Sequence, residues 1–149
     1  IQPQSRIHSM VEFVDGSVIA QLGPSDMRIP IQLAFSYPDR WESPATSVDF
    51  CQEVPLQFSQ PDMTTFKCLA LAFEAGRTGG TLPCAMNAAN EIANAAFRKK
   101  NLSFLGIPEV VEQVMNLTDV EHVESLEQLE DVDRLARKRA EAIIGGLEV

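Results

Sequence analysis

The first 22 residues alternate between apolar and polar side chains, a pattern typical of β-strands. Two alternating runs flank Asp15-Gly16, a dipeptide that favours a two-residue type I′ turn. We therefore expect a β-hairpin over residues 6–22, with its register fixed by that turn. The turn would oppose Phe13 to Val18, Val11 to Ala20 and Ser9 to Leu22.

Alternation sorts the hairpin side chains onto two faces. One face reads as part of a core and holds Ile7, Ser9, Val11, Phe13, Val18, Ala20 and Leu22. The other face mixes Met10, Val14 and Ile19 with polar groups that include His8, which suits an interface or a cleft wall. Because a lone hairpin is only marginally stable in water, we expect its neighbours to come from a preceding part of a longer protein, from a second subunit, or from both.

Residues 24–61 predict a connector, since they contain six of the nine prolines. Only Ile31–Tyr37 has a pattern long enough for a short helix. Residues 48–50 and 56–58 fit short extended segments. The stretch is also rich in aromatic residues, so we expect it to lie packed against other parts of the protein.

After Pro61 the apolar pattern takes the period of a helix. We expect helices over 67–77, 81–100, 108–117 and 125–144, the last interrupted near Asp131. Four such helices predict a small bundle. Its expected apolar positions are Leu69, Ala72, Phe73, Met86, Ala89, Ile92, Ala93, Ala96, Phe97, Val110, Val111, Val114 and Met115.

Local signals set the expected helix ends. Gly79-Gly80 would stop the first helix and Thr81 would cap the second. Pro108 suits a first turn. Residues 125–128, which read SLEQ, have the form of a capping box.

Composition narrows the classes of partner. Apolar residues make up 45% and charged residues 22%, and the net charge is −9, so no basic footprint for a nucleic acid is present. The longest apolar run, Cys68–Phe73, is far shorter than the roughly 20 residues of a membrane span. Three cysteines without zinc spacing indicate reduced thiols in a cytoplasmic protein. We find no signal peptide and no initiator Met at Ile1, and expect a piece cut from a longer protein.

The residues alone offer few candidates for chemistry, since no phosphate-binding loop, dinucleotide-binding turn or zinc-protease motif occurs. His122 falls in an acidic loop and is expected to be solvated. For His8, a structural and a functional role both remain open. A helical stripe of three amides and one carboxylate is either a binding surface or a set of hydrogen bonds to the aromatic connector or an adjacent domain, and carries too little charge for a metal. This stripe comprises Asn87, Asn90, Glu91 and Asn94.

Three sequence segments, taken in order, are more informative than composition and periodicity. Residues 3–12 read PQSRIHSMVE, residues 15–31 read DGSVIAQLGPSDMRIPI, and residues 87–91 read NAANE. In this order and spacing they closely resemble the C-terminal part of the 1-deoxy-D-xylulose 5-phosphate reductoisomerase family. The resemblance extends over essentially the whole chain.

The resemblance implies an enzyme that converts 1-deoxy-D-xylulose 5-phosphate to 2-C-methyl-D-erythritol 4-phosphate in non-mevalonate isoprenoid biosynthesis. It implies NADPH, Mg²⁺ or Mn²⁺, and a homodimer. Residues 1–24 would be the last strands of the catalytic domain, 25–61 the connector and 62–149 the helical domain. The expected fold is thus an α+β fragment: a β-hairpin from an α/β catalytic domain, a connector, and a mainly α four-helix bundle.

The resemblance also assigns site residues. Ser5 and His8 match positions that line the active site, where His8 would orient substrate or a closing loop, and Met27 matches a position that packs against the nicotinamide. The family usually has His where Gln2 stands, so any acid–base duty there is lost. Metal ligands, phosphate-binding residues and the glycine-rich cofactor loop belong to other segments, so the chain alone is expected to be inactive.

Two other readings remain open. The chain could be a stand-alone module whose helical bundle binds a partner protein, or a family relative that has lost activity, for which Gln2 is the only hint.

Overall fold

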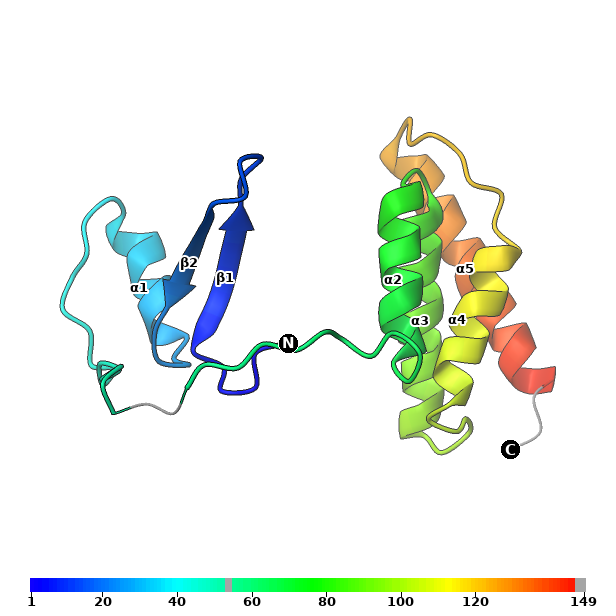
Figure 1. The fold of residues 1–149 in the computed structure, drawn as a ribbon. Coiled ribbons are helices and arrows are strands. Elements are labelled where there is room, and N and C mark those ends of the chain that lie inside the picture. Colours follow the sequence, from blue (N-terminus) through cyan, green and yellow to red (C-terminus); the bar gives the residue numbers. More distant parts are fainter. Residues whose placement is uncertain (53–54, 147–149) are drawn as a thin grey trace. The chain divides into compact units, whose positions relative to one another are not determined.

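The computed structural model describes residues 1–52 and 55–146, which divide into two compact units, Ile1–Pro61 and Asp62–Val149. The first unit contains the strands β1 (Ile7–Glu12) and β2 (Val18–Leu22) and the helix α1 (Arg28–Ser36). The second contains four helices, α2 (Lys67–Thr78), α3 (Leu82–Arg98), α4 (Gly106–Asn116) and α5 (Leu126–Gly146) (Figure 1). The expected fold class, a hairpin followed by a mainly helical bundle, is confirmed.

The hairpin forms where the sequence predicts it, but its register is shifted by one residue. Phe13 exchanges backbone hydrogen bonds with Ser17 and Gly16, so the loop has three residues, with Gly16 at φ +83°. This is a type I turn closed by a left-handed glycine, which needs only one positive φ, whereas a type I′ turn needs two. Val11 therefore opposes Ile19, and the predicted pairing of Val11 with Ala20 is wrong.

The shift also changes the faces, because a one-residue slip turns every side chain of one strand over. The expected core face is not buried by the residues that the structure describes: Val11 is 57%, Phe13 46% and Val18 52% exposed. A second irregularity lies at His8, which is the extra residue between the pairs Ile7–Leu22 and Ser9–Gln21. Such a β-bulge turns a side chain away from the alternation of its strand.

The connector is more helical at its start than the pattern predicts. Helix α1 begins at Arg28, and Pro30 sits in its first turn, where a missing N–H costs nothing. The helix ends at Ser36, ahead of Pro38. The predicted extended segments at 48–50 and 56–58 are not strands.

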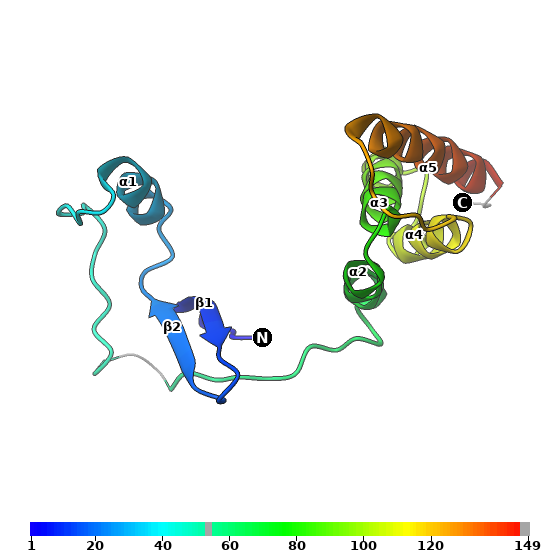
Figure 2. The ribbon, with the colours of Figure 1, turned by 90° about the horizontal axis from the view of Figure 1, so that it is seen from above.

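The second unit is built around α3, which packs against α2, α4 and α5 (Figure 2). Four of its five buried residues are alanines, the fifth being Leu82, so the neighbouring backbones approach closely. From α4 the predicted residues Val110, Val111, Val114 and Met115 are all buried. In α2 the expected stripe is wrong: Leu71 and Ala75 are buried, while Leu69 and Phe73 are exposed, because this helix is apolar on more than one side. Helix α5 runs without the predicted interruption at Asp131.

Thr81 begins α3 as predicted, but its hydroxyl does not cap the helix. Its Oγ1 accepts a hydrogen bond from the backbone N–H of Glu121 (3.1 Å), and its own N–H donates to the Glu121 carbonyl (3.0 Å). Thr81 is fully buried, so this pair of bonds fastens the α2–α3 turn to the segment between α4 and α5. The capping box at 125–128 is modified: Gln128 N–H donates to Ser125 Oγ, but the Gln128 side chain accepts from Glu124 N–H.

Gly80 in this turn leaves no room for a side chain. Its φ is +57°, and an added Cβ would lie 2.3 Å from the Glu121 carbonyl oxygen. We expect Gly80→Ala to destabilise the bundle by about 3 kcal/mol, measured by urea unfolding of the chain. Gly76→Ala is the matched control, because an added Cβ there has no neighbour within 4 Å, and it should stabilise by up to about 1 kcal/mol. Equal effects at the two glycines would contradict this account of the turn.

Candidate functional site

A pocket of about 490 Å³ lies in the first unit, bounded by the end of β2, the turn that follows it and α1. It brings together all three residues that the resemblance assigns to a site, Ser5, His8 and Met27, although Met27 follows His8 by 19 residues in the sequence. Gln21, Pro24, Ser25, Asp26, Ile29, Pro30, Leu33 and Arg40 complete the lining.

His8 is oriented by the backbone at the end of the hairpin. Its Nε2 lies 3.2 Å from the carbonyl oxygen of Gly23 and 3.2 Å from that of Pro24. A carbonyl oxygen can only accept, so the ring must carry a proton on Nε2. In the neutral imidazole this leaves Nδ1 as a hydrogen-bond acceptor. The bulge in β1 therefore presents a histidine of defined tautomer to the pocket.

Ser5 also lines the pocket, in an unusual backbone conformation. Its φ is +52°, in the left-handed region, which costs a residue with a Cβ about 1–2 kcal/mol. Ser25 Oγ donates a hydrogen bond to the Ser5 carbonyl oxygen (2.8 Å), which ties the two walls of the pocket together. Strained backbone of this kind persists only where the surroundings determine it, and it gathers at functional sites.

Met27 is one of the apolar residues of the lining; it stands just before α1 and is 71% exposed. Its neighbours carry a charge pair: the Arg28 guanidinium donates to both carboxylate oxygens of Asp26, the shorter bond being 2.6 Å. These hydrogen bonds lower the pKa of Asp26 to about 2, so the carboxylate stays ionised at neutral pH. The exposed thioether thus lies beside a neutralised ion pair.

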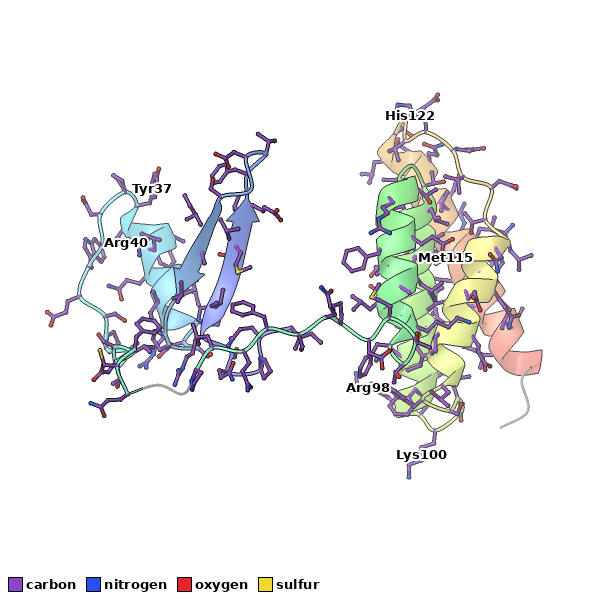
Figure 3. All side chains as sticks on the ribbon, in the orientation of Figure 1. Tyr37, Arg40, Arg98, Lys100, Met115 and His122 are labelled. Carbon is purple, nitrogen blue, oxygen red and sulfur yellow. The ribbon has the colours of Figure 1, made fainter. Side chains whose placement is uncertain are left out.

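Two further residues of the lining, Ser25 and Arg40, have no signal in the sequence. Arg40 follows the end of α1 and lines the pocket from the connector (Figure 3). A lone arginine after a proline and a serine before an aspartate carry no spacing signal, so only the folded chain brings them to the pocket.

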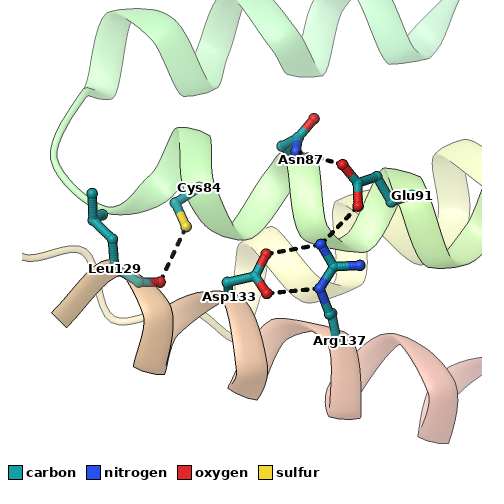
Figure 4. Close-up of polar contacts among 6 residues, drawn as sticks. All are labelled: Cys84, Asn87, Glu91, Leu129, Asp133 and Arg137. Atoms are coloured by element: carbon teal, nitrogen blue, oxygen red, sulfur yellow. Dashed lines mark hydrogen bonds and ion pairs between the residues drawn. The ribbon is translucent and has the colours of Figure 1, made fainter. Parts of the chain in front are cut away.

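A second polar cluster joins α3 to α5 in the other unit (Figure 4). Arg137 donates to both oxygens of Asp133 (2.7 and 3.0 Å) and to Glu91 (2.7 Å), and Asn87 donates to Glu91 (3.1 Å). The hydrogen bonds from Arg137 hold the pKa of Asp133 and of Glu91 below their ordinary values. Asn87 and Glu91 of the predicted stripe therefore bond within the bundle, where the sequence predicts a binding surface or bonds to the connector or an adjacent domain.

Within residues 1–52 and 55–146, no three His, Cys, Asp or Glu side chains are grouped so that they could hold a metal ion. In the same ranges no helix is long and apolar enough to cross a membrane. His122 is exposed, as expected.

The DXP reductoisomerase C-terminal domain family matches residues 22–139. A 1-deoxy-D-xylulose 5-phosphate reductoisomerase from Ruminiclostridium cellulolyticum is 52% identical over 144 residues, 97% of this chain and 38% of the relative. One from Heliobacterium modesticaldum is 44% identical over 150 residues, 100% of this chain and 38% of the relative.

Solved structures agree. The Zymomonas mobilis reductoisomerase in complex with NADPH aligns with a TM-score of 0.89 at 44% identity, covering 98% of this chain and 39% of that one. A DOX-P reductoisomerase in complex with NADPH, fosmidomycin and magnesium aligns with a TM-score of 0.85 at 38% identity, covering 97% and 38%. The chain thus spans a little over a third of the length of the relatives that it matches.

Proposed function

The chain belongs to the DXP reductoisomerase C-terminal domain family, and on that premise we propose that it is the C-terminal part of an enzyme that converts 1-deoxy-D-xylulose 5-phosphate to 2-C-methyl-D-erythritol 4-phosphate. The observation that carries the proposal is the pocket that gathers Ser5, His8 and Met27. Residues 1–24 would then be the last strands of the catalytic domain, 25–61 the connector and 62–149 the helical domain.

The side chains that line the pocket suit one wall of a binding site for a nicotinamide ring. NADPH, when bound, supplies a hydride to the substrate. Met27 is exposed and polarizable, which suits contact with a flat ring. Nδ1 of His8 can accept a hydrogen bond from a substrate hydroxyl or from a closing loop, while Nε2 stays engaged with the backbone. Ser5 adds a hydroxyl to the lining.

The described residues do not fit a metal site, so we assign no residue of this chain to the Mg²⁺ or Mn²⁺ that the family uses. We propose that its ligands, like the substrate-phosphate contacts, come from the rest of the enzyme. The two exposed faces of the hairpin support a further proposal: they are covered by the remaining catalytic domain and by a second subunit of a homodimer. The three free cysteines favour a cytoplasmic location.

The test of this function uses the full-length protein that contains the chain. Purified enzyme should oxidise NADPH when 1-deoxy-D-xylulose 5-phosphate and Mg²⁺ or Mn²⁺ are both present, and each omission should abolish the reaction, as read from NADPH absorbance. Failure to consume NADPH with either metal would leave a protein-interaction module, or a relative without activity, as the better reading.

A further inference from the structure

Three glutamines form a hydrogen-bonded chain between the connector and the pocket. Gln4 Nε2 donates to Gln57 Oε1 (3.0 Å), and the backbone N–H of Gln57 donates to Gln4 Oε1 (3.2 Å). Gln2 Nε2 donates to the same Gln4 oxygen. The three amides therefore join residue 57, near the end of the connector, to the segment that leads into β1.

This series of hydrogen bonds ends at the backbone around Ser5. Gln2 Oε1 accepts hydrogen bonds from the N–H groups of Arg6 (2.8 Å) and Ile7 (3.5 Å). The Gln2 carbonyl accepts from the Ser5 N–H (3.1 Å). The backbone bond closes a turn over residues 2–5 that ends at Ser5, whose φ is +52°. The Gln2 side chain therefore engages the two backbone donors that directly follow the strained residue.

We propose that Gln2, Gln4 and Gln57 are positioning residues, a glutamine relay that holds Ser5 in the left-handed conformation and thereby shapes the pocket. The inference rests on the proposed function for its effect on catalysis. It also gives position 2 a role that needs no proton charge. An amide offers an acceptor and a donor at once, and Gln2 uses both.

Kinetics of the full-length enzyme test the relay. Gln2→Ala should lower kcat/KM about 10-fold, because the Gln2 side chain bonds directly to the backbone that follows Ser5. Gln57→Ala should lower it about 3-fold, because the Gln57 side chain acts only through Gln4. Gln60→Ala is the matched control: Gln60 is exposed in the same segment, and its side chain makes no hydrogen bond to the residues that the structure describes, so kcat/KM should be unchanged. A Gln57→Ala enzyme that behaves like Gln60→Ala would overturn the relay.

A double-mutant cycle with Ser5→Gly separates positioning from a general loss of stability. Glycine adopts positive φ at no steric cost, so it needs less restraint from Gln2. In the Ser5→Gly background, Gln2→Ala should therefore cost less than 3-fold, whereas in the Ser5 enzyme it costs about 10-fold. Equal costs in the two backgrounds would show that Gln2 does not act through the conformation of Ser5.

A readout without turnover keeps this inference distinct from the proposed function. In full-length protein labelled on serine, the NMR resonances of Ser5 should shift in Gln2→Ala and in Gln57→Ala and stay in place in Gln60→Ala. If the wild-type protein fails to oxidise NADPH while these shifts occur, the proposed function is wrong and the relay stands. If the Ser5 resonances shift in neither variant, the relay is wrong whatever the activity.

Discussion

The isolated chain, residues 1–149, should oxidise no NADPH above background when supplied with 1-deoxy-D-xylulose 5-phosphate and Mg²⁺. It spans 38% of the relatives that it matches, and its described residues offer one wall of a pocket without a group of metal-binding side chains. Hydride transfer needs the cofactor and the substrate held together, and loss of that orientation alone removes many orders of magnitude in rate. We therefore expect a loss greater than 10⁵-fold relative to the full-length enzyme.

Inactivity is informative only if the chain is folded. Far-UV circular dichroism should show the helical signal of α2–α5, whose core is complete within residues 62–146. The full-length enzyme, assayed at the same concentration, serves as the positive control. Turnover by the folded 149-residue chain would mean that metal and cofactor sites lie within it, against the domain assignment proposed above.

Replacing His8 by alanine in the full-length enzyme should lower kcat/KM about 10²-fold, equivalent to about 2.7 kcal/mol of transition-state stabilisation. The substitution removes the Nδ1 acceptor from the pocket. It also leaves the carbonyls of Gly23 and Pro24 without the Nε2 donor that orients the turn. Steady-state kinetics with each substrate varied in turn measure the effect.

His122→Ala is the control for this experiment. His122 is the other histidine of the chain, exposed in the segment between α4 and α5, and its imidazole lies outside the pocket. Its removal should change kcat/KM by less than 2-fold. If the two histidine variants behave alike, His8 is a surface residue and the pocket is not the site of catalysis.

The sequence specifies the bundle well because its helix ends carry local chemical signals. Gly79-Gly80 ends α2, and Pro83 and Pro108 fall in the first turns of α3 and α4. The same reasoning fails for the buried side of α2, where Leu69, Leu71 and Phe73 are all apolar and periodicity cannot choose among them. Contacts with α3 and α4, which are long-range, make that choice.

For the hairpin, the local sequence specifies the strands but not how they pair. Its strands follow from alternation, but Val14-Asp15-Gly16 supports either a two-residue or a three-residue loop, and the difference moves every cross-strand pair. No local pattern signals the bulge at His8. Ser5, His8 and Met27 were assigned through resemblance, and their roles stay predictions, while Ser25 and Arg40 join the pocket only through tertiary structure.

The exposed β1–β2 hairpin has a practical consequence for the preparation of residues 1–149 alone. Among the described residues, β1 and β2 form a two-stranded sheet, so the outer edge of each strand has no strand beside it, and Val11 and Ile19 are exposed next to these edges. Such edges recruit strands from other copies and seed aggregates. The net charge of −9 opposes that self-association through mutual repulsion, and salt screens the repulsion. Solutions of residues 1–149 should therefore become turbid sooner at high ionic strength than at low ionic strength.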